Sequence, residues 1–156
     1  MNSQHKKSDK STKRWGTGEI IVENAHVLNN NDQPQTVYTD NDETLKLTVR
    51  YKSINTDEPD PVFGVVISDG AGQRVFASNT LWKKTATRRI RANESVLVSW
   101  IIPNVFNTGT YTVSPAVADR AGVKIYDWSS DLLAFKIRKK IHSNAIVNVA
   151  HKITVD

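Results

Sequence analysis

Alternation of apolar and polar residues runs through much of this chain and predicts a series of short β-strands. The clearest run has its apolar positions at Leu45, Leu47, Val49 and Tyr51. A second run, over residues 94–102, places on one face Val96, Val98, Trp100 and Ile102. Because successive side chains of a strand point to opposite faces, each run is expected to bury one face, with Trp100 in the core.

Residues 61–80 form the stretch around which the rest of the prediction is arranged. The apolar run 62–67 predicts a buried strand, residues 69–72 (DGAG) suit a tight turn, and residues 75–77 return the chain. This is the pattern of a β-hairpin. Its return strand ends on Ser78, Asn79 and Thr80 and is followed by Leu81 and Trp82. A polar and aromatic surface is therefore expected there, and it is the first place to look for a ligand.

The remaining segments complete an all-β prediction without an amphipathic helix. The alternation within residues 19–28 shifts partway, which indicates a bulge. Residues 83–91 show no clear period and are expected to form a long exposed loop. Further strands are predicted at 36–38, 110–119, 124–128, 132–137 and, after a basic spacer, 145–150. Short strands with frequent turns are typical of an antiparallel β-sandwich of immunoglobulin-like or jelly-roll topology.

Length and charge favour one domain with basic tails. The 156 residues carry a net charge of +5 and are 38% hydrophobic. Residues 1–14 hold five basic residues and one acidic residue, whereas residues 15–137 hold 12 basic and 14 acidic residues. We therefore expect residues 1–14 to be a disordered basic linker and residues 15–156 to form the sandwich, with 145–156 as a separable terminal strand. A basic tail without interleaved aromatics does not favour nucleic-acid binding.

The sequence offers no motif for catalysis, a metal or a cofactor. It has no cysteine, and its four histidines, His5, His26, His142 and His151, lack the spacing of metal ligands. Neither a Gly-x-Ser-x-Gly motif nor a phosphate-binding Gly-x-x-x-x-Gly-Lys-Ser/Thr loop is present. No apolar run is long enough to span a membrane, and no cleavable leader is recognisable. A non-catalytic protein without cofactor or metal is expected.

Several phrases resemble, in their order, one protein family. They are RWGTGEI at 14–20, VVISD at 65–69 closing on ASNT at 77–80, GTYTVS at 109–114, DW at 127–128 before FKI at 135–137, and IVNVAH at 146–151. This set resembles the C-terminal carbohydrate-binding domain of Wzt, the ATP-binding subunit of ABC transporters that export O-antigen polysaccharides. Ala150 and Ile153 stand where a proline and a tryptophan of that family are expected.

The resemblance implies a function and a set of partners. The domain would recognise the capped non-reducing end of a bacterial surface polysaccharide and so couple chain completion to export. It would form a homodimer by exchange of the C-terminal strand, and it would work with the nucleotide-binding and membrane domains of the transporter. The location implied is cytoplasmic, at the inner face of the cytoplasmic membrane, with the basic leader as an interdomain linker. Because this chain lacks a phosphate-binding loop, any ATPase domain would lie outside it.

Sugar recognition needs aromatic faces beside planar polar side chains, and this requirement selects the candidate site residues. They are Asn79, Thr80, Trp82, Arg88, Asp119, Tyr126 and Trp128. Arg88, with Arg89 and Arg91, would clamp an anionic cap, as guanidinium groups match carboxylates and phosphates. Trp15 is expected to be a lid at one end of the sandwich and not part of the site.

Each candidate also has a purely structural interpretation. Trp82 would be a hydrophobic plug under the long loop, Trp128 and Tyr126 would pack on their own core, and the arginines would belong to a solvated loop. Asp119 would pair with Arg120 inside a turn. The alternative function is an immunoglobulin-like module that is structural or binds protein, without sugar affinity. Sugar binding requires Trp82 or Trp128 to be exposed, whereas the alternative predicts that both are buried.

Overall fold

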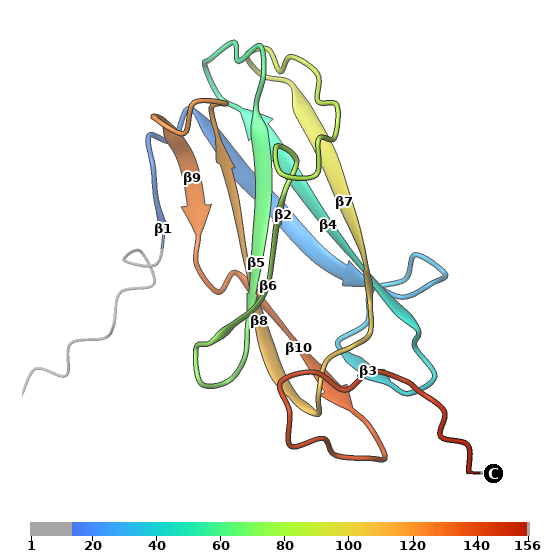
Figure 1. Cartoon of the computed structure of the whole chain (residues 1–156). Helices are drawn as coiled ribbons and strands as arrows, with labels where there is room; N and C mark the ends of the chain where they lie inside the picture. The colour runs from blue at the N-terminus through green and yellow to red at the C-terminus, as the bar shows by residue number, and fades with distance from the viewer. Residues whose placement is uncertain (1–13, 156) are drawn as a thin grey trace, which may run out of the picture.

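The computed structural model describes residues 14–155 and contains, within them, strands and turns but no helix (Figure 1). The strands are β1 (Arg14–Trp15), β2 (Ile20–Leu28), β3 (Val37–Thr39), β4 (Thr44–Ser53), β5 (Val62–Ser68), β6 (Arg74–Asn79), β7 (Ser95–Pro103), β8 (Gly109–Ala118), β9 (Ile125–Ser129) and β10 (Leu133–Arg138). The strands predicted between residues 19 and 137 and the central hairpin are confirmed, including the bulge in β2, which lies between Val22 and Asn24.

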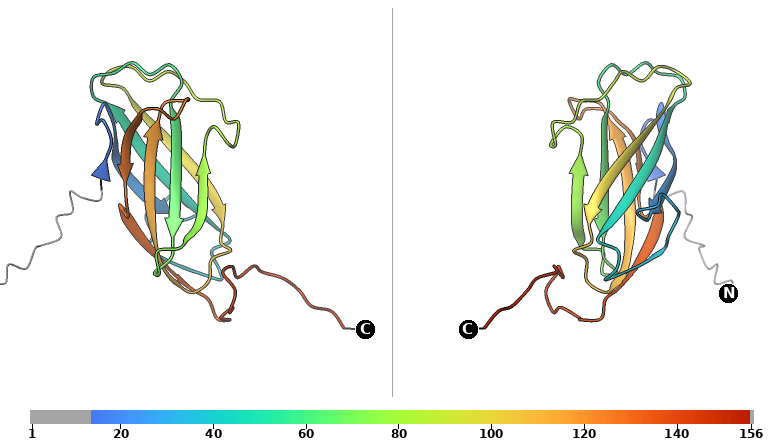
Figure 2. Two further views of the ribbon diagram at one scale, coloured as in Figure 1. Left: turned by 60° about the vertical axis from the view of Figure 1, so that its left-hand side comes forward. Right: turned by 90° about the vertical axis from the view of Figure 1, so that its right-hand side faces the viewer.

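Two sheets face each other to form a β-sandwich (Figures 1 and 2). The smaller sheet has the order β2-β4-β7. In the seven-stranded sheet β8 is central: β5 lies along one side of it, and β9 and β10 share the other side. The sheet then continues outward to β6 beyond β5, to β1 beyond β9 and to β3 beyond β10. All these pairs are antiparallel except β10 with β3, which is parallel.

The core lies between the sheets and is rich in aromatic side chains. Tyr51 and Phe63 pack at a centroid distance of 4.6 Å and so connect the small sheet to the large one. At the other end of the core, the Phe135 ring lies 5.5 Å from Tyr111, 5.9 Å from Phe106 and 6.1 Å from Tyr38. Trp100 is only partly buried and packs against the margin of this core, so its predicted core position is correct only in part.

A buried carboxylate connects three strands at the β9 edge. Asp127 is 3% exposed and accepts hydrogen bonds from the Arg14 guanidinium, at 3.0 and 2.5 Å, and from the Val22 backbone nitrogen, at 2.7 Å. Arg14 therefore belongs to the ordered sandwich and not to the linker predicted for residues 1–14. Residues 1–13 of that linker, and Asp156, lie outside the described residues.

The predicted strand at 145–150 does not form within this chain. Val147 makes an isolated bridge to Phe106, and the Asn148 nitrogen donates to the Val105 carbonyl. The Asn107 amide donates to the Ala145 carbonyl, and the Lys139 ammonium donates to the Asn148 carbonyl. The chain after this segment extends away from the sandwich (Figure 2). Its exposed apolar side chains are Ile146, Val147, Val149, Ile153 and Val155.

The aromatic core predicts a large stability difference between two substitutions. Phe135→Ala removes a ring that is 2% exposed and packs on three aromatic neighbours, so the free energy of unfolding should fall by about 3–5 kcal/mol. Val123→Ala, at a position 83% exposed, should change it by less than about 0.5 kcal/mol. Urea denaturation of both variants tests this. A loss below about 1 kcal/mol for Phe135→Ala would contradict the assigned packing.

Candidate ligand-binding cleft

A cleft of about 250 Å³ lies on the outer face of the large sheet. It crosses β6, β5, β8 and β9, and the strand register explains why. Asn79, Gly64, Ala116 and Trp128 are successive partners on these four strands, and Trp15 on β1 is the partner of Trp128. Since directly opposed residues share a face, the row carries small residues in the middle and large side chains at both ends.

Small side chains make the floor of the cleft. Gly64 and Ala116 occupy the central row, with Val62 and Ala118 in the next row along the same strands. A Cβ atom at Gly64 would lie 3.2 Å from the Asn79 Cβ and 3.3 Å from the Ser78 carbonyl oxygen. The lack of a side chain at this position therefore keeps the floor low and lets Asn79 lie against it.

Trp82 and Asn79 form one end of the cleft. The Asn79 side-chain oxygen accepts a hydrogen bond from the Trp82 backbone nitrogen at 2.8 Å, which fixes the turn that follows β6. The Trp82 side chain is left 69% exposed beside the floor. Within residues 14–155 the Asn79 side-chain nitrogen has no hydrogen-bond partner, so it is available as a donor. The predicted polar and aromatic surface at the end of the hairpin is present.

Trp128 forms the opposite end of the cleft, where Arg74 and Trp15 contact its ring. The Trp128 indole nitrogen donates to the Ser130 hydroxyl at 2.8 Å, and this bond fixes the ring. The Arg74 guanidinium lies 5.8 Å from the ring centroid, and the Trp15 ring stacks on it at 6.2 Å. In the described part of the chain Arg74 makes no ion pair, so its donors face the cleft unpaired. Trp15 is thus exposed beside the cleft and is not the lid that the sequence predicted.

A β-bulge separates Tyr126 from Trp128. Simple alternation would place both on one face, but the register between β8 and β9 shifts at Val117 and Ala118. Two consecutive residues, Tyr126 and Asp127, consequently face inward, and Trp128 faces outward. Tyr126 is 3% exposed and donates its hydroxyl proton to Glu58; burial and this bond raise the pKa of the phenol above its ordinary value. Tyr126 is therefore a structural residue in this fold.

The side chains of Thr80 and Asp119 accept hydrogen bonds from backbone nitrogens. Thr80 is 7% exposed, and its hydroxyl accepts a hydrogen bond from the Phe63 nitrogen at 3.1 Å. One carboxylate oxygen of Asp119 accepts hydrogen bonds from the nitrogens of Val123 and Lys124. The alternative pairing of Asp119 with Arg120 is replaced by an ion pair between Arg120 and Asp60, at 2.9 Å.

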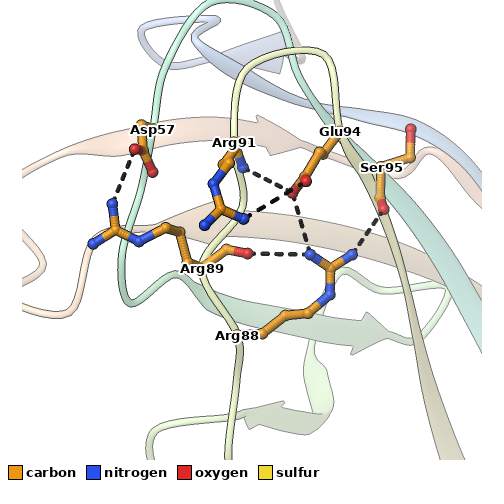
Figure 3. Close-up of polar contacts among 6 residues, drawn as sticks. All are labelled: Asp57, Arg88, Arg89, Arg91, Glu94 and Ser95. Atoms are coloured by element: carbon orange, nitrogen blue, oxygen red, sulfur yellow. Dashed lines mark hydrogen bonds and ion pairs between the residues drawn. The ribbon is translucent and has the colours of Figure 1, made fainter.

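Arg88 lies in the loop cluster at one end of the sandwich, among acceptors of its own loop (Figure 3). It donates to the Arg89 carbonyl, to Glu94 and to the Ser95 carbonyl. Arg89 pairs with Asp57 at 2.9 Å, and Glu94 also accepts from the Arg91 backbone nitrogen. These hydrogen bonds lower the pKa of the Glu94 carboxyl. The bond from the Arg91 backbone has the larger effect, and the bond from the Arg88 side chain has the smaller one. Arg88 does not line the cleft.

The sequence therefore supplied three of the cleft residues, Asn79, Trp82 and Trp128. It missed Arg74, Gly64 and Trp15, since their roles depend on which strands become neighbours. A tryptophan next to a predicted strand, as at Trp15, is a weak indication of a binding surface. Nothing in the sequence around Gly64 distinguishes the floor of a cleft from an ordinary glycine in a strand.

The described residues hold neither a cluster of metal ligands nor a membrane-spanning helix. No group of three or more His, Cys, Asp or Glu side chains in residues 14–155 is arranged to hold a metal ion. In the same residues no helix is long and apolar enough to cross a membrane.

Comparison with known proteins identifies a family and a similar solved fold. Residues 11–149 match the family described as the Wzt C-terminal domain. The crystal structure of the C-terminal domain of wzt superposes with a TM-score of 0.80 at 16% sequence identity, covering 92% of this chain and 87% of that chain. A domain of the outer membrane lipoprotein Omp28 from Porphyromonas gingivalis is less similar, with a TM-score of 0.45 at 18% identity over 80% of this chain and 92% of that chain. No curated protein matches the sequence.

The opposite orientations of Tyr126 and Trp82 predict opposite effects on stability. Tyr126→Phe removes the hydroxyl that serves the Glu58 carboxylate, which is 8% exposed, and should lower the free energy of unfolding by about 1–3 kcal/mol. Trp82→Ala, at an exposed position, should change it by less than about 0.5 kcal/mol. Thermal or urea unfolding measures both. Equal stability of Tyr126→Phe and the unmodified chain would mean that the hydroxyl is free.

Proposed function

The chain belongs to the Wzt C-terminal domain family, and from this premise we propose that it binds the non-reducing terminus of a bacterial surface polysaccharide of the O-antigen type. The observation that carries the proposal is the cleft between Trp82 and Trp128. Pyranose rings present apolar C–H faces and equatorial hydroxyls, so they bind where aromatic rings stand beside planar donors. The proposed ligand contacts are the two indoles, the Asn79 amide and the Arg74 guanidinium.

The dimensions of the cleft favour a chain end over a long internal stretch. Three strand spacings separate β6 from β9, which corresponds to about 14 Å. A volume of about 250 Å³ is near the lower limit of small-molecule sites and suits about one terminal unit with its substituent. The Arg74 side chain stands over Trp128 and narrows one end. Recognition of the capped terminus would couple completion of the polysaccharide to its export.

In this proposal the domain performs no chemistry itself. Its partners are the nucleotide-binding and membrane domains of an ABC transporter, and its place is the inner face of the cytoplasmic membrane. The sandwich of residues 15–156, extended by Arg14, is the carbohydrate-binding unit, and residues 1–13 are the linker to those domains. Neither a cofactor nor a metal enters the proposed function.

We also propose a homodimer in which the C-terminal segment, residues 145–156, is exchanged. Within one chain the segment exposes a row of apolar side chains and makes a single bridge. Among the described strands the edge strand β7 pairs with β4 alone. It carries no charged residue and exposes Leu97 and Ile101. Uncharged edges with apolar side chains readily accept another strand. A groove of about 450 Å³ between β6 and β7 adds space for one.

Titration with the polysaccharide of the source organism tests the binding proposal. We expect saturable binding by calorimetry that depends on the natural terminal residue. Trp82→Ala and Trp128→Ala should each weaken it about tenfold, the effect of losing about 1–1.5 kcal/mol of stacking. Arg89→Ala, which breaks the distant ion pair with Asp57, is the matched control and should bind normally.

Three results of this titration would contradict the proposal in different ways. Equal affinity for preparations with and without the terminus would indicate recognition of internal sugars. Normal binding by both tryptophan variants would move the site away from the cleft. Absence of binding would favour the alternative, an immunoglobulin-like module that is structural or binds protein.

The dimer proposal predicts a change of mass in solution. Sedimentation equilibrium of the full chain should give twice the 17.5 kDa monomer mass, and Val147→Asp with Val149→Asp should shift it to the monomer. The buried apolar contacts of the exchanged strand would then have to accommodate two charges, which is costly. Val123→Asp, on an exposed turn, is the control and should remain dimeric. A dimer that survives the double substitution would exclude exchange of this segment.

A further inference from the structure

We propose that β1 is a ligand-linked element: Trp15 positions Trp128 in the wall of the cleft, so that occupancy of the cleft and docking of β1 reinforce each other. This inference rests on the proposed function, since it concerns the same cleft. It assigns a role to Arg14, Trp15 and Gly16, which precede the first long strand.

Arg14 attaches β1 to the rest of the sandwich. Its guanidinium binds both carboxylate oxygens of Asp127 and also donates to the Val22 carbonyl at 2.9 Å. The Asp127 side chain is 4% exposed, whereas that of Arg14 is 44% exposed. A buried carboxylate needs a partner, and here the partner comes from the solvent side of β9. Docking of β1 therefore satisfies a charge that is built into the sandwich.

The backbone that follows β1 approaches β9 closely. The Thr17 and Gly18 nitrogens donate to the carbonyls of Ile125 and Tyr126, at 3.1 and 2.8 Å. Gly16 has a φ of 134°, and a Cβ atom there would lie 2.5 Å from the Tyr126 carbonyl oxygen. Only glycine allows this path. The segment 14–18 is thus laid along β9 by specific contacts, at the strand that carries Trp128.

Trp15 stacks on Trp128. The two rings lie 6.2 Å apart with an interplanar angle of 19°, and Trp15 remains 54% exposed. The Ser130 hydroxyl accepts a hydrogen bond from the Trp128 indole nitrogen, and the stacked Trp15 ring restrains one face of the same indole. Together the two contacts fix the orientation of the Trp128 ring. A sugar that packs on Trp128 gains from a ring that is already oriented. Trp15 is accordingly a positioning residue for the cleft.

Local stability explains why this contact would respond to the ligand. Within residues 14–155, β1 comprises Arg14 and Trp15, lies at the edge of the sheet and pairs with β9 alone. Short, exposed edge segments open at a lower free energy than the core of a domain. A ligand that binds better when β1 is docked must, by linkage, favour docking by the same factor.

Hydrogen exchange of the full chain, with and without the polysaccharide of the source organism, measures this linkage. The amides of Thr17 and Gly18 report docking, and we expect their exchange to slow about tenfold at saturation. The turn at residues 29–33, where the Asp32 nitrogen donates to the Asn29 carbonyl and no residue lines the cleft, serves as the internal control and should not change. Unaltered exchange at Thr17 and Gly18 in the saturated protein would overturn the inference.

Two variants separate positioning from stability. Trp15→Ala should lower the affinity for the same polysaccharide about fivefold to tenfold while the thermal unfolding midpoint stays within a few degrees, since Trp15 is half exposed. Trp15→Phe keeps an aromatic ring against Trp128 and should recover most of the affinity. Binding by Trp15→Ala at the unmodified level would overturn this inference alone. Failure of the unmodified chain to bind would overturn the proposed function, and the inference with it.

Discussion

The buried carboxylate of Asp127 is the constraint on which the geometry of this sandwich depends. A carboxylate at 3% exposure must be paired, and its partners come from β1 and β2, so one side chain joins both sheets and the first strand. To face inward directly after Tyr126, it requires the bulge between β8 and β9. That bulge in turn returns Trp128 to the outer face. The ion pair of Asp127 with Arg14 and the position of Trp128 in the cleft wall both follow from this β-bulge.

The outer face of the large sheet differs from its inner face in the distribution of side-chain size. Inward positions carry the large aromatic and aliphatic residues of the core, such as Phe63, Val113 and Phe135. Outward positions in the central strands hold Gly64 and Ala116 with the valines Val62 and Val66 beside them, and the two indoles lie at the flanking strands. A flat floor between two indoles is the result. This arrangement suits a rigid ring-shaped ligand because little side-chain entropy is lost on binding.

The arginines at 88, 89 and 91 form ion pairs with acidic residues of the neighbouring loops, so they are not free to bind a ligand. Three arginines within four residues look like an anion clamp, but Asp57 and Glu94 lie within reach once the loops fold together (Figure 3). Arg74, isolated in the sequence, is the cation left without an acidic partner among the described residues near the cleft. The density of arginines in the sequence therefore did not predict which cation lies at the cleft, because ion pairs form between residues that are distant in sequence.

The sequence by itself determined the strands, the hairpin at 61–80, the sandwich and the family resemblance, because side-chain alternation and turn residues act over a few neighbours. It also identified Asn79, Trp82 and Trp128. Only the tertiary structure decided that Trp82 and Trp128 share one cleft, that Tyr126 and Thr80 are buried, and that Trp15 stacks on Trp128. These facts depend on strand order and on a bulge, which bring together residues as far apart as Trp15 and Trp128. Alternation along one strand carries no information about its neighbours in the sheet.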